Sequence, residues 1–353
     1  MTPKITIDGQ IVPFEPGETV LDVASRLGHA IPSLCHEPRL KPTGACRMCL
    51  VEVQGQRRLQ PSCAWKAEDG AVVTTRNDRI DTHRRTLLSM YVADHALDAD
   101  GLPVDQGGTG NRLRTHVKDL GTGPALEPLT AVRRDRDDSN PYVHFDPASC
   151  VVCGACVRYC DEVEAVSAIS LIDRGRRTTI GTADQQGLLD SSCELCGGCI
   201  AVCPTGAMTE KPALGVPRDP EPTRTTCNFC GVGCQVDIHV RDGRISRVTS
   251  PPPGTTVNDG NLCVKGRFAM EFVHHPERLT SPMIRVDGEL VPTTWDVALQ
   301  TAARGLLGVK QRHGADALGF VSSSRCTGEE NYLMQKLARA AFGTNNCHQW
   351  AAT

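Results

Sequence analysis

The sequence has few aromatic side chains and no long apolar run. Phe, Trp and Tyr together make up 4% of its 353 residues. No apolar segment approaches the length needed to cross a bilayer. Residues 1–8 also lack the apolar stretch of a secretory signal. We therefore expect no membrane insertion and a reducing, cytoplasmic setting.

An excess of positive charge is also missing, because the formal net charge is −3. Surfaces that bind nucleic acid carry clustered positive charge, so we expect no nucleic-acid partner. The length predicts two or three domains. The abundant residue is cysteine, with 18 copies. In a reducing compartment, closely spaced thiols indicate metal binding rather than disulfides.

Residues 150–204 contain two copies of one cysteine pattern. Two residues separate the first three cysteines of each copy, and three residues precede the fourth. This is the bacterial ferredoxin spacing for [4Fe–4S] clusters, in which the fourth cysteine of each copy binds the other cluster. Pro204 follows the second copy, whereas Asp161 follows the first. We expect one [4Fe–4S] site at Cys150, Cys153, Cys156 and Cys203, and its partner at Cys193, Cys196, Cys199 and Cys160. Zinc, which also accepts four thiolates, is the alternative occupant.

A different spacing occurs near the N-terminus. Residues 4–14 alternate apolar and polar side chains around Asp8-Gly9, which predicts a hairpin. Thr19 and Asp22 then predict the capping box of a helix. The cysteines that follow resemble those of plant-type [2Fe–2S] ferredoxins, in the longer-gapped form that begins the G subunit of NADH-quinone oxidoreductase. The resemblance implies a β-grasp domain with [2Fe–2S] ligands Cys35, Cys46, Cys49 and Cys63, and zinc is again the alternative.

Residues 64–149 contain no cysteine. The resemblance to the G subunit implies a histidine-ligated [4Fe–4S] cluster here, and the matching histidine is His95. The three cysteines expected with it would fall on Ala99, Leu102 and Gly108. One imidazole without thiolates cannot hold such a cluster, so we expect that this cluster is absent. His95 is then expected to be a solvated or packed histidine.

A third spacing follows a proline-rich tether at residues 211–222. Two, three and then 28 residues separate the four cysteines, with a predicted hairpin turning at Asp242-Gly243. This pattern resembles the [4Fe–4S] domain that opens the catalytic subunits of molybdenum and tungsten enzymes with a bis-pterin guanine dinucleotide cofactor. The resemblance implies that Lys265 relays electrons between cluster and pterin, with a plain surface cation as the alternative. The implied ligands are Cys227, Cys230, Cys234 and Cys263.

Residues 279–353 resemble the molybdopterin domain of formate dehydrogenase α subunits. A helix from Trp295 is predicted to present one apolar face, which includes Leu299 and Leu306. Thr327 and Glu330 predict a second capping box, and the helix they begin is predicted to bury Leu333, Leu337, Ala338 and Ala341. In the family a metal-ligating cysteine or selenocysteine, followed by histidine, lies several residues after a double asparagine. Here Cys347 follows Asn346 at once, so Cys347 is a weak candidate ligand.

The predicted fold is a multidomain α+β chain. It comprises a β-grasp [2Fe–2S] ferredoxin domain (1–78), a cysteine-free helical or linker region (79–140), a double [4Fe–4S] ferredoxin module (141–210), a [4Fe–4S] domain of the molybdenum/tungsten bis-pterin type (222–278) and the start of an α/β pterin-binding domain (279–353). We expect one [2Fe–2S] and three [4Fe–4S] clusters. A molybdenum- or tungsten-bis-molybdopterin guanine dinucleotide is expected in a full-length family member alone, since the sequence ends early.

The resemblance implies the α subunit of a cytoplasmic, NAD-coupled formate dehydrogenase. Electrons from formate would pass through the clusters to flavin- and NAD-binding partner subunits. The chain alone is expected not to be catalytically competent. Two alternatives stay open: a truncated, non-catalytic electron-transfer protein, and a relative of the NADH-quinone oxidoreductase G subunit that works in quinone reduction.

Overall fold

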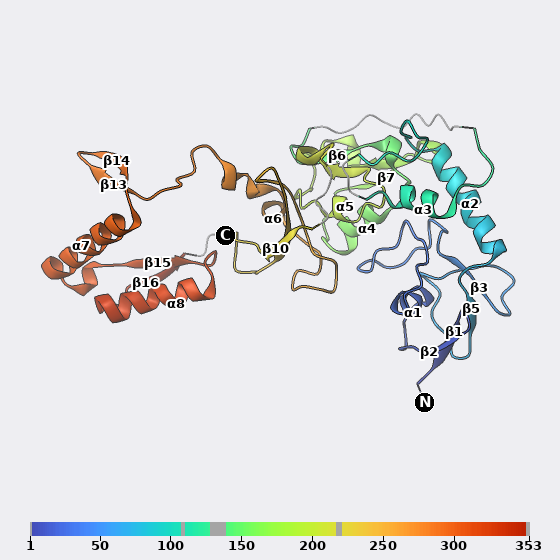
Figure 1. The fold of residues 1–353 in the computed structure, drawn as a ribbon, viewed down its shortest axis with the longest axis horizontal. Coiled ribbons are helices and arrows are strands. Elements are labelled where there is room, and N and C mark those ends of the chain that lie inside the picture. The colour runs from blue at the N-terminus through green and yellow to red at the C-terminus, as the bar shows by residue number, and fades with distance from the viewer. Residues whose placement is uncertain (1, 107–109, 128–138, 217–220, 351–353) are drawn as a thin grey trace.

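The computed structural model describes residues 2–106, 110–127, 139–216 and 221–350. The domains follow one another as a row, with the N-terminal sheet at one end and the helices α7 (Trp295–His313) and α8 (Gly328–Lys336) at the other (Figure 1). None of the helices in these described ranges is both long enough and apolar enough to cross a membrane.

The N-terminal domain is a five-stranded sheet in the order β2-β1-β5-β3-β4. Asp8 and Gly9 both have positive φ, which lets the chain turn within two residues, so the predicted hairpin is confirmed. β1 runs parallel to β5, and β3 runs antiparallel to both β5 and β4. The strands are β1 (Lys4–Ile7), β2 (Gln10–Pro13), β3 (Leu50–Val53), β4 (Gln60–Pro61) and β5 (Val72–Thr74).

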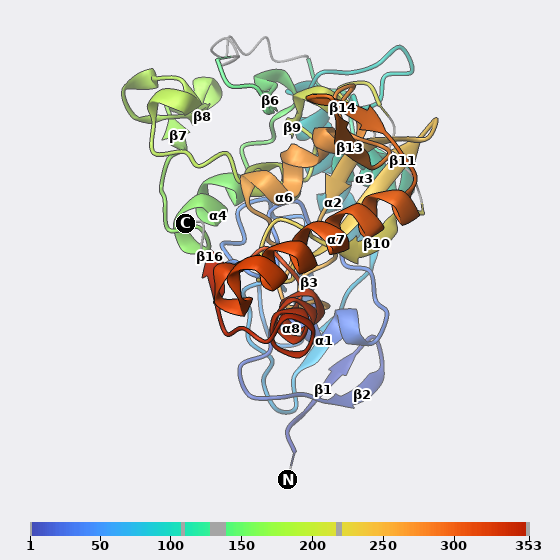
Figure 2. The same cartoon turned by 90° about the vertical axis from the view of Figure 1, so that its left-hand side faces the viewer.

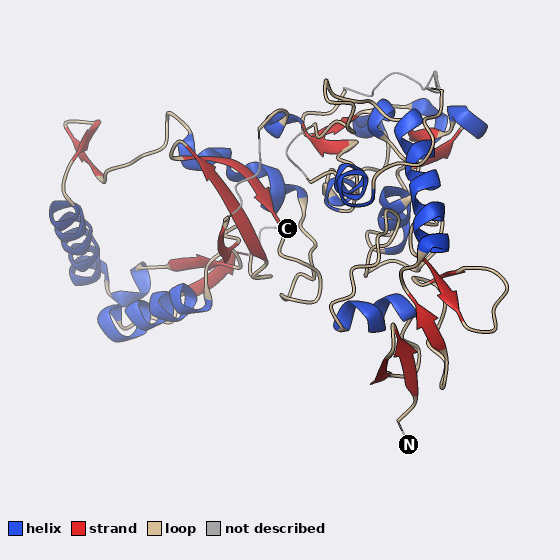
Figure 3. Ribbon diagram, turned by 45° about the vertical axis from the view of Figure 1, so that its right-hand side comes forward, coloured by secondary structure: helices blue, strands red, loops and turns tan. Residues whose placement is uncertain are grey.

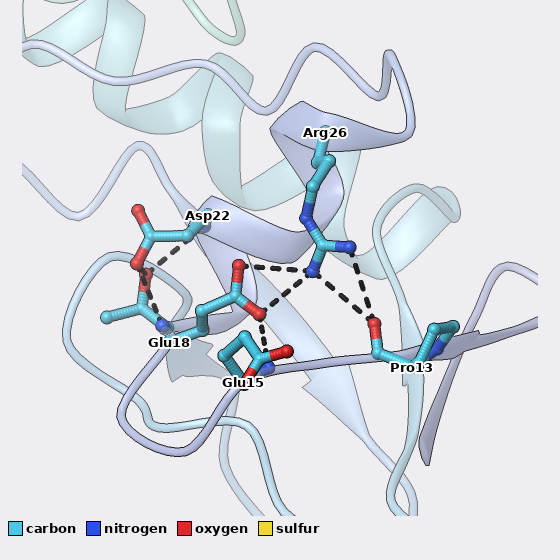
Figure 4. A network of polar contacts seen from close by, with 6 residues as sticks. Pro13, Glu15, Glu18, Asp22 and Arg26 are labelled. Carbon is cyan, nitrogen blue, oxygen red and sulfur yellow. Dashed lines mark hydrogen bonds and ion pairs between the residues drawn. The ribbon is translucent and has the colours of Figure 1, made fainter. Parts of the chain in front are cut away.

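Helix α1 (Val20–Arg26) covers this sheet and begins at the predicted capping box. The Thr19 hydroxyl accepts from the Asp22 amide, and the Asp22 carboxylate accepts from the Thr19 amide. At its other end, Arg26 pairs with Glu18 at 2.8 Å and also donates to the Pro13 carbonyl oxygen (Figure 4). These contacts tie the helix to the end of β2.

Two helices from the cysteine-free region lie against the cysteine loop of the first domain. Both begin at an asparagine that caps the helix with its side chain, Asn77 and Asn111. Leu88 from the first and Leu113 from the second pack with Cys35 and Cys46. The helices are α2 (Asp78–Ala93) and α3 (Arg112–Leu120).

The ferredoxin module contains two short helices enclosed by small antiparallel strand pairs. Helix α4 (Ala155–Glu162) carries Cys156 and Cys160, and helix α5 (Gly198–Ala201) carries Cys199. β6 pairs with β9, and β7 pairs with β8. These strands are β6 (Val143–Phe145), β7 (Ser170–Ile172), β8 (Thr179–Gly181) and β9 (Met208–Glu210).

The next domain is a three-stranded antiparallel sheet followed by one short helix (Figure 3). Asp242 and Gly243 have positive φ at the predicted hairpin turn. A 3-10 turn at Ala269–His274 continues the helix. The elements are β10 (Thr223–Thr226), β11 (Gln235–Arg241), β12 (Arg244–Thr249) and α6 (Val264–Phe268).

The last part is an α/β unit in which β15 and β16 run parallel beside two helices (Figure 1), and Figure 2 shows these helices, α7 and α8, facing the viewer. Leu306 of α7 and Met334 of α8 pack onto the core formed by Phe320, Ala338 and Phe342. The elements are β13 (Met283–Val286), β14 (Glu289–Pro292), α7 (Trp295–His313), β15 (Phe320–Ser323), α8 (Gly328–Lys336), a π-helical turn (Leu337–Phe342) and β16 (Cys347–Trp350).

The predicted apolar faces of these two helices are largely wrong. Trp295 is 68% exposed and Leu299 is 60% exposed, because α7 packs onto the core of this unit farther along, through Leu306. Leu333 and Leu337 are also exposed, whereas the neighbouring Ala338 is buried as predicted. The capping box at Thr327 and Glu330 is confirmed.

Candidate metal centres

The first cysteine site comprises a buried loop between α1 and β3, which holds three cysteines, and Cys63, which follows β4. Cys35, Cys46, Cys49 and Cys63 are all at most 3% exposed. They form two pairs: the Cys49 and Cys63 Sγ atoms lie 3.4 Å apart, and the Cys46 amide donates to Cys35 Sγ at 3.4 Å. The Leu34 amide donates to Cys46 Sγ at 3.4 Å. Such inward-pointing amides stabilise thiolates and the clusters that thiolates hold.

Each pair contains one thiol that loses its proton readily. The pKa of Cys35 falls to about 5, chiefly because Cys46 donates a hydrogen bond to it. The pKa of Cys49 falls to about 7 through the corresponding bond from Cys63. The two donors, Cys46 and Cys63, have raised pKa values for the same reason. Thiolates are the metal-binding form of cysteine, so in each pair one sulfur favours that form and the other must lose its proton when a cation binds.

The second site is a cavity inside the ferredoxin module. The four thiols grouped by the sequence pattern, Cys150, Cys153, Cys156 and Cys203, all line it. The Val152 amide donates to Cys150 Sγ at 3.3 Å, and the Met208 amide donates to Cys203 Sγ at 3.4 Å. Three ligands from one run and one from the other therefore surround one space.

A neighbouring cavity has the reciprocal composition. Its lining includes Cys160 from the first run and Cys193, Cys196 and Cys199 from the second. The amides of Leu195, Gly198 and Ala168 donate to the sulfurs of Cys193, Cys196 and Cys160 at 3.3–3.4 Å. Each cavity is thus lined by the first three cysteines of one run and the fourth cysteine of the other run.

The two runs also repeat a backbone conformation. Val152 and Leu195, the second spacer residue in each run, have φ of +52° and +53°. Gly154 and Gly197, which follow the next cysteine, have φ of +69° and +72°. A non-glycine residue with positive φ is strained, and such turns direct successive amides into one concavity. The strain at Val152 and Leu195 is therefore explained by the amide–sulfur bonds just described.

Burial makes these thiols poor acids when no cation is near. It raises the pKa of Cys153 to about 11 and that of Cys196 to about 12. Burial likewise raises the pKa values of Cys156 and Cys199. Two such thiols belong to each cavity, so binding of a metal centre there would release protons, and metal binding would then contribute to folding.

The last quartet is more open. Cys227 is buried and Cys234 is half-buried, whereas Cys230 and Cys263 are exposed. Burial raises the pKa of Cys234, and the negative charge that Cys227, Cys230 and Cys263 carry as thiolates would raise it further. The Cys227 amide donates to the Cys234 carbonyl oxygen at 2.8 Å and closes the loop between them.

Among the described residues, no three His, Cys, Asp or Glu side chains are grouped closely enough to hold one metal ion. Four thiolates can hold either a zinc ion or an iron–sulfur cluster, so the chemistry of these quartets is compatible with both.

Side-chain contacts connect the four sites in a row. Cys153 packs against the group that contains Cys35 and Cys46, so the first and second sites adjoin. Arg158 strengthens this junction by donating to the Cys35 carbonyl oxygen at 2.8 Å. The second and third sites share α4, which carries Cys156 and Cys160.

The third and fourth sites adjoin through α6. Arg267 Nε donates to the Cys196 carbonyl oxygen at 3.0 Å. On the same helix, a Cβ placed on Gly266 would lie 3.7 Å from Cys227 Sγ. One turn of helix therefore touches a ligand of each site.

Three residues singled out by the sequence lie outside these cavities. Lys265 is an exposed residue of α6, two residues after Cys263. Cys347 begins β16, where it is half-buried and packs against the core of the last unit. His95 is 8% exposed, hence packed rather than solvated, and its Nδ1 lies 2.8 Å from the Ala96 carbonyl oxygen. Ala99 and Leu102 follow His95 in a turn, and Gly108 lies outside the described residues.

Sequence reasoning missed the residues that join the sites, namely Arg158, Tyr159 and Arg267. Tyr159 is buried between the two ferredoxin runs and packs so tightly on Gly198 that a Cβ there would lie 1.8 Å from the ring. Their positions in the sequence could have indicated them, because each lies in a helix and within four residues of a cysteine of one quartet.

Family models match four successive parts of the chain. Residues 3–78 match the 2Fe-2S iron-sulfur cluster binding domain, and residues 140–209 match the ferredoxin-like domain of NADH-quinone oxidoreductase subunit 3. Residues 221–275 match the molybdopterin oxidoreductase Fe4S4 domain, and residues 278–353 match the molybdopterin oxidoreductase model.

Relatives with several different names resemble almost the whole chain. It is 38% identical over 97% of its length to NADPH-Fe(3+) oxidoreductase subunit alpha of Geobacter sulfurreducens, covering 40% of that protein. It is 38% identical over 99% of its length to a G subunit of NADH-quinone oxidoreductase from Rhizobium meliloti, again covering 40%. A Staphylococcus aureus protein named "Putative formate dehydrogenase" is 30% identical over 97% of the chain, which covers 38% of that relative.

The chain therefore spans about 40% of the length of these curated relatives. Among solved structures, an NAD+-reducing [NiFe]-hydrogenase in the H2-reduced state is similar, with a TM-score of 0.52 and 30% sequence identity. The match covers 63% of this chain and 92% of that one. Together these matches place the chain in the molybdopterin oxidoreductase family, with a [2Fe–2S] domain and a ferredoxin-like domain ahead of its Fe4S4 domain.

Proposed function

We propose that this chain is the iron–sulfur electron-transfer part of a formate dehydrogenase α subunit. In this role it conducts single electrons between a molybdenum– or tungsten–pterin centre and flavin-bearing partner subunits that reduce NAD. The observation that supports the proposal is the row of four adjoining cysteine sites. Iron–sulfur clusters supply one-electron chemistry over roughly −700 to +450 mV, a range wide enough to connect formate with NAD.

We propose the following ligands for one [2Fe–2S] and three [4Fe–4S] clusters. In the [2Fe–2S] site, the pair Cys35 and Cys46 would bind one iron, and the pair Cys49 and Cys63 the other. The cubes would be held by Cys150, Cys153, Cys156 and Cys203; by Cys160, Cys193, Cys196 and Cys199; and by Cys227, Cys230, Cys234 and Cys263. The amide–sulfur bonds and the composition of the cavities support these groupings.

The outermost sites suggest where electrons enter and leave. The Cys227 site has two exposed thiols and adjoins the molybdopterin domain in sequence, so we assign it to the pterin side. Lys265, exposed beside Cys263, is the candidate relay to that cofactor. Cys347 is a weaker candidate metal ligand, because it packs into the core of its own unit.

The partners follow from the other end of the row. The similar hydrogenase is named for NAD+ reduction, and the Rhizobium meliloti relative is named as part of an NADH-quinone oxidoreductase. We therefore propose a flavin- and NAD-binding partner beside the [2Fe–2S] domain, in the cytoplasm. The relative named as a formate dehydrogenase supports formate as the electron donor.

A second candidate function is electron transfer in an NADH-quinone oxidoreductase, and 38% identity over nearly the whole chain favours it. A third is a non-catalytic electron carrier. Two experiments on the anaerobically purified protein distinguish these functions. The first assays iron, acid-labile sulfide, molybdenum, tungsten and pterin, and the second measures dye reduction by formate or by NADH.

For this chain alone we expect iron and sulfide for one [2Fe–2S] and three [4Fe–4S] centres, without formate turnover. Restored formate-dependent dye reduction in the complete complex would support the formate dehydrogenase assignment. Reduction by NADH with no response to formate in that complex would favour the NADH-quinone oxidoreductase alternative. Zinc without acid-labile sulfide would overturn electron transfer altogether.

A further inference from the structure

Arg267 is a buried cation at the junction of two candidate cluster sites. It lies on α6, four residues after Cys263, and only 4% of it is exposed. Its Nε donates to the carbonyl oxygen of Cys196, a residue that belongs to the other site. The next residue, Phe268, stacks on Tyr142 of the ferredoxin module at 4.6 Å, which fixes the orientation of the helix.

The space around Arg267 is shaped for its side chain. A Cβ on Gly197 would lie 2.3 Å from Arg267 Cδ and 3.0 Å from Phe268 Cζ. Gly197 also has φ of +72°, a conformation that side-chain-bearing residues rarely adopt. Position 197 therefore favours glycine for two reasons: its backbone has positive φ, and the Arg267 side chain approaches it closely.

The charge of Arg267 is left without a full set of partners. Within the described ranges, the guanidinium donates from Nε to a neutral carbonyl oxygen, whereas its buried Nη2 has no hydrogen-bond partner. A buried charge is costly unless opposite charge lies near. Sulfur becomes negatively charged when it binds a metal centre as thiolate, and the carbonyl oxygen that accepts from Arg267 belongs to one of the candidate ligands, Cys196.

We propose that Arg267 sets the redox potential of the neighbouring cluster, the one held by Cys160, Cys193, Cys196 and Cys199, and docks the Cys227 domain onto it. The inference rests on the proposed function, because it needs a [4Fe–4S] cluster in that site. Reduction adds one negative charge to the cluster, and a fixed cation beside its ligands stabilises the added charge. Arg267 is thus a positioning residue that raises this potential and favours electron arrival from the Cys227 site.

The test is a redox titration of the cluster-loaded protein followed by electron paramagnetic resonance. The variants are Arg267→Gln, which removes the charge, and Arg267→Lys, which keeps it. The matched control is Arg241→Gln, which removes an exposed cation from β11 of the same domain. The relevant signal is the one that disappears in Cys193→Ser.

Arg267→Gln is expected to shift the midpoint potential of that signal to a more negative value, with the other signals unmoved. Arg267→Lys should recover most of the shift, and Arg241→Gln should show none. An unchanged potential in an Arg267→Gln protein with full iron content would overturn the proposal. Loss of iron from both Arg267 variants would also overturn it, in favour of a role in folding alone.

If Arg267→Gln loses iron and Arg267→Lys keeps it, the charge itself is needed beside the anionic cluster, which supports the proposal. Failure of the proposed function has a different signature, because the unmodified protein would then contain no iron or acid-labile sulfide. Iron content of the unmodified protein therefore distinguishes the two failures before any variant is measured.

Discussion

Arg39 Nη1 donates to the side-chain oxygen of Asn261 at 2.8 Å, across 222 residues of sequence. The Tyr159 hydroxyl donates to the same oxygen at 2.6 Å, and the Arg39 guanidinium lies 5.0 Å from the Tyr159 ring centre. One amide oxygen thus joins the [2Fe–2S] domain, the ferredoxin module and the Cys227 domain. The relative positions of the cluster sites depend on this three-way contact.

Asn261→Ala is expected to loosen the junction. The substitution leaves the buried Tyr159 hydroxyl with Glu164 as its remaining partner and removes an acceptor from Arg39. Loss of a partner from buried polar groups costs about 1–3 kcal/mol. Urea unfolding of the cluster-loaded protein measures this cost. Asn345→Ala is the matched control, because Asn345 accepts from Arg339 on the surface, and its cost should stay within about 0.5 kcal/mol. Equal costs for both variants would contradict the junction's role.

Gly198→Ala should destabilise the ferredoxin module. The added methyl would meet the Tyr159 ring at 1.8 Å, and the ring is enclosed by the junction on its other side. Overpacking of this kind costs about 1–3 kcal/mol. Thermal unfolding measures the effect.

A matched glycine is available in α7. Nothing lies within 4 Å of a Cβ on Gly305, so Gly305→Ala should be neutral or stabilise its helix by about 0.5–1 kcal/mol. A Gly198→Ala protein as stable as Gly305→Ala would show that the Tyr159 ring moves aside freely.

The exchange of fourth cysteines predicts which single substitutions damage the same cluster. Cys160→Ser should abolish the same electron paramagnetic resonance signal as Cys193→Ser, although Cys160 belongs to the run of Cys150. Without the exchange, Cys160→Ser would match Cys150→Ser instead. Cys326→Ser is the control, because Cys326 is in no quartet, and it should retain all signals and all iron.

Removal of iron should unfold the ferredoxin module before the N-terminal sheet. The module's core contains Cys156 and has five further cysteines of the quartets packed against it, whereas the core beneath β1 is made of Ile, Val, Phe and Ala side chains without cysteine. Hydrogen exchange after anaerobic chelation should show lost protection in α4 and retained protection in β1. Simultaneous loss of protection in both would mean that the N-terminal sheet also depends on bound metal for its folding.

The sequence predicted those features that depend on local chemistry. The turn at Asp8-Gly9 and the capping boxes at Thr19 and Thr327 were predictable because each depends on residues at most three positions apart. The proposed exchanged quartets follow from another regularity, which is the spacing that cluster chemistry imposes on its thiolate ligands.

The features it did not predict depend on distant packing. Periodicity gave α7 an apolar face, but only neighbouring elements determine whether such a face is covered, and Trp295 is exposed. Arg39, Asn261 and Arg267 are common residue types with no distinguishing spacing. Their roles arise from contacts between domains, which no local pattern in the sequence records.

The thiols of the four sites differ in solvent exposure, and this difference affects how the protein responds to air. Oxygen and peroxide oxidise sulfur atoms that are exposed to solvent. The thiols of Cys230 and Cys263 are exposed, whereas the cysteines of the N-terminal domain are buried. Aerobic damage should therefore begin at the Cys227 site and advance toward the N-terminal domain. A partly bleached sample would still hold its [2Fe–2S] colour after the Cys227 site had lost its iron.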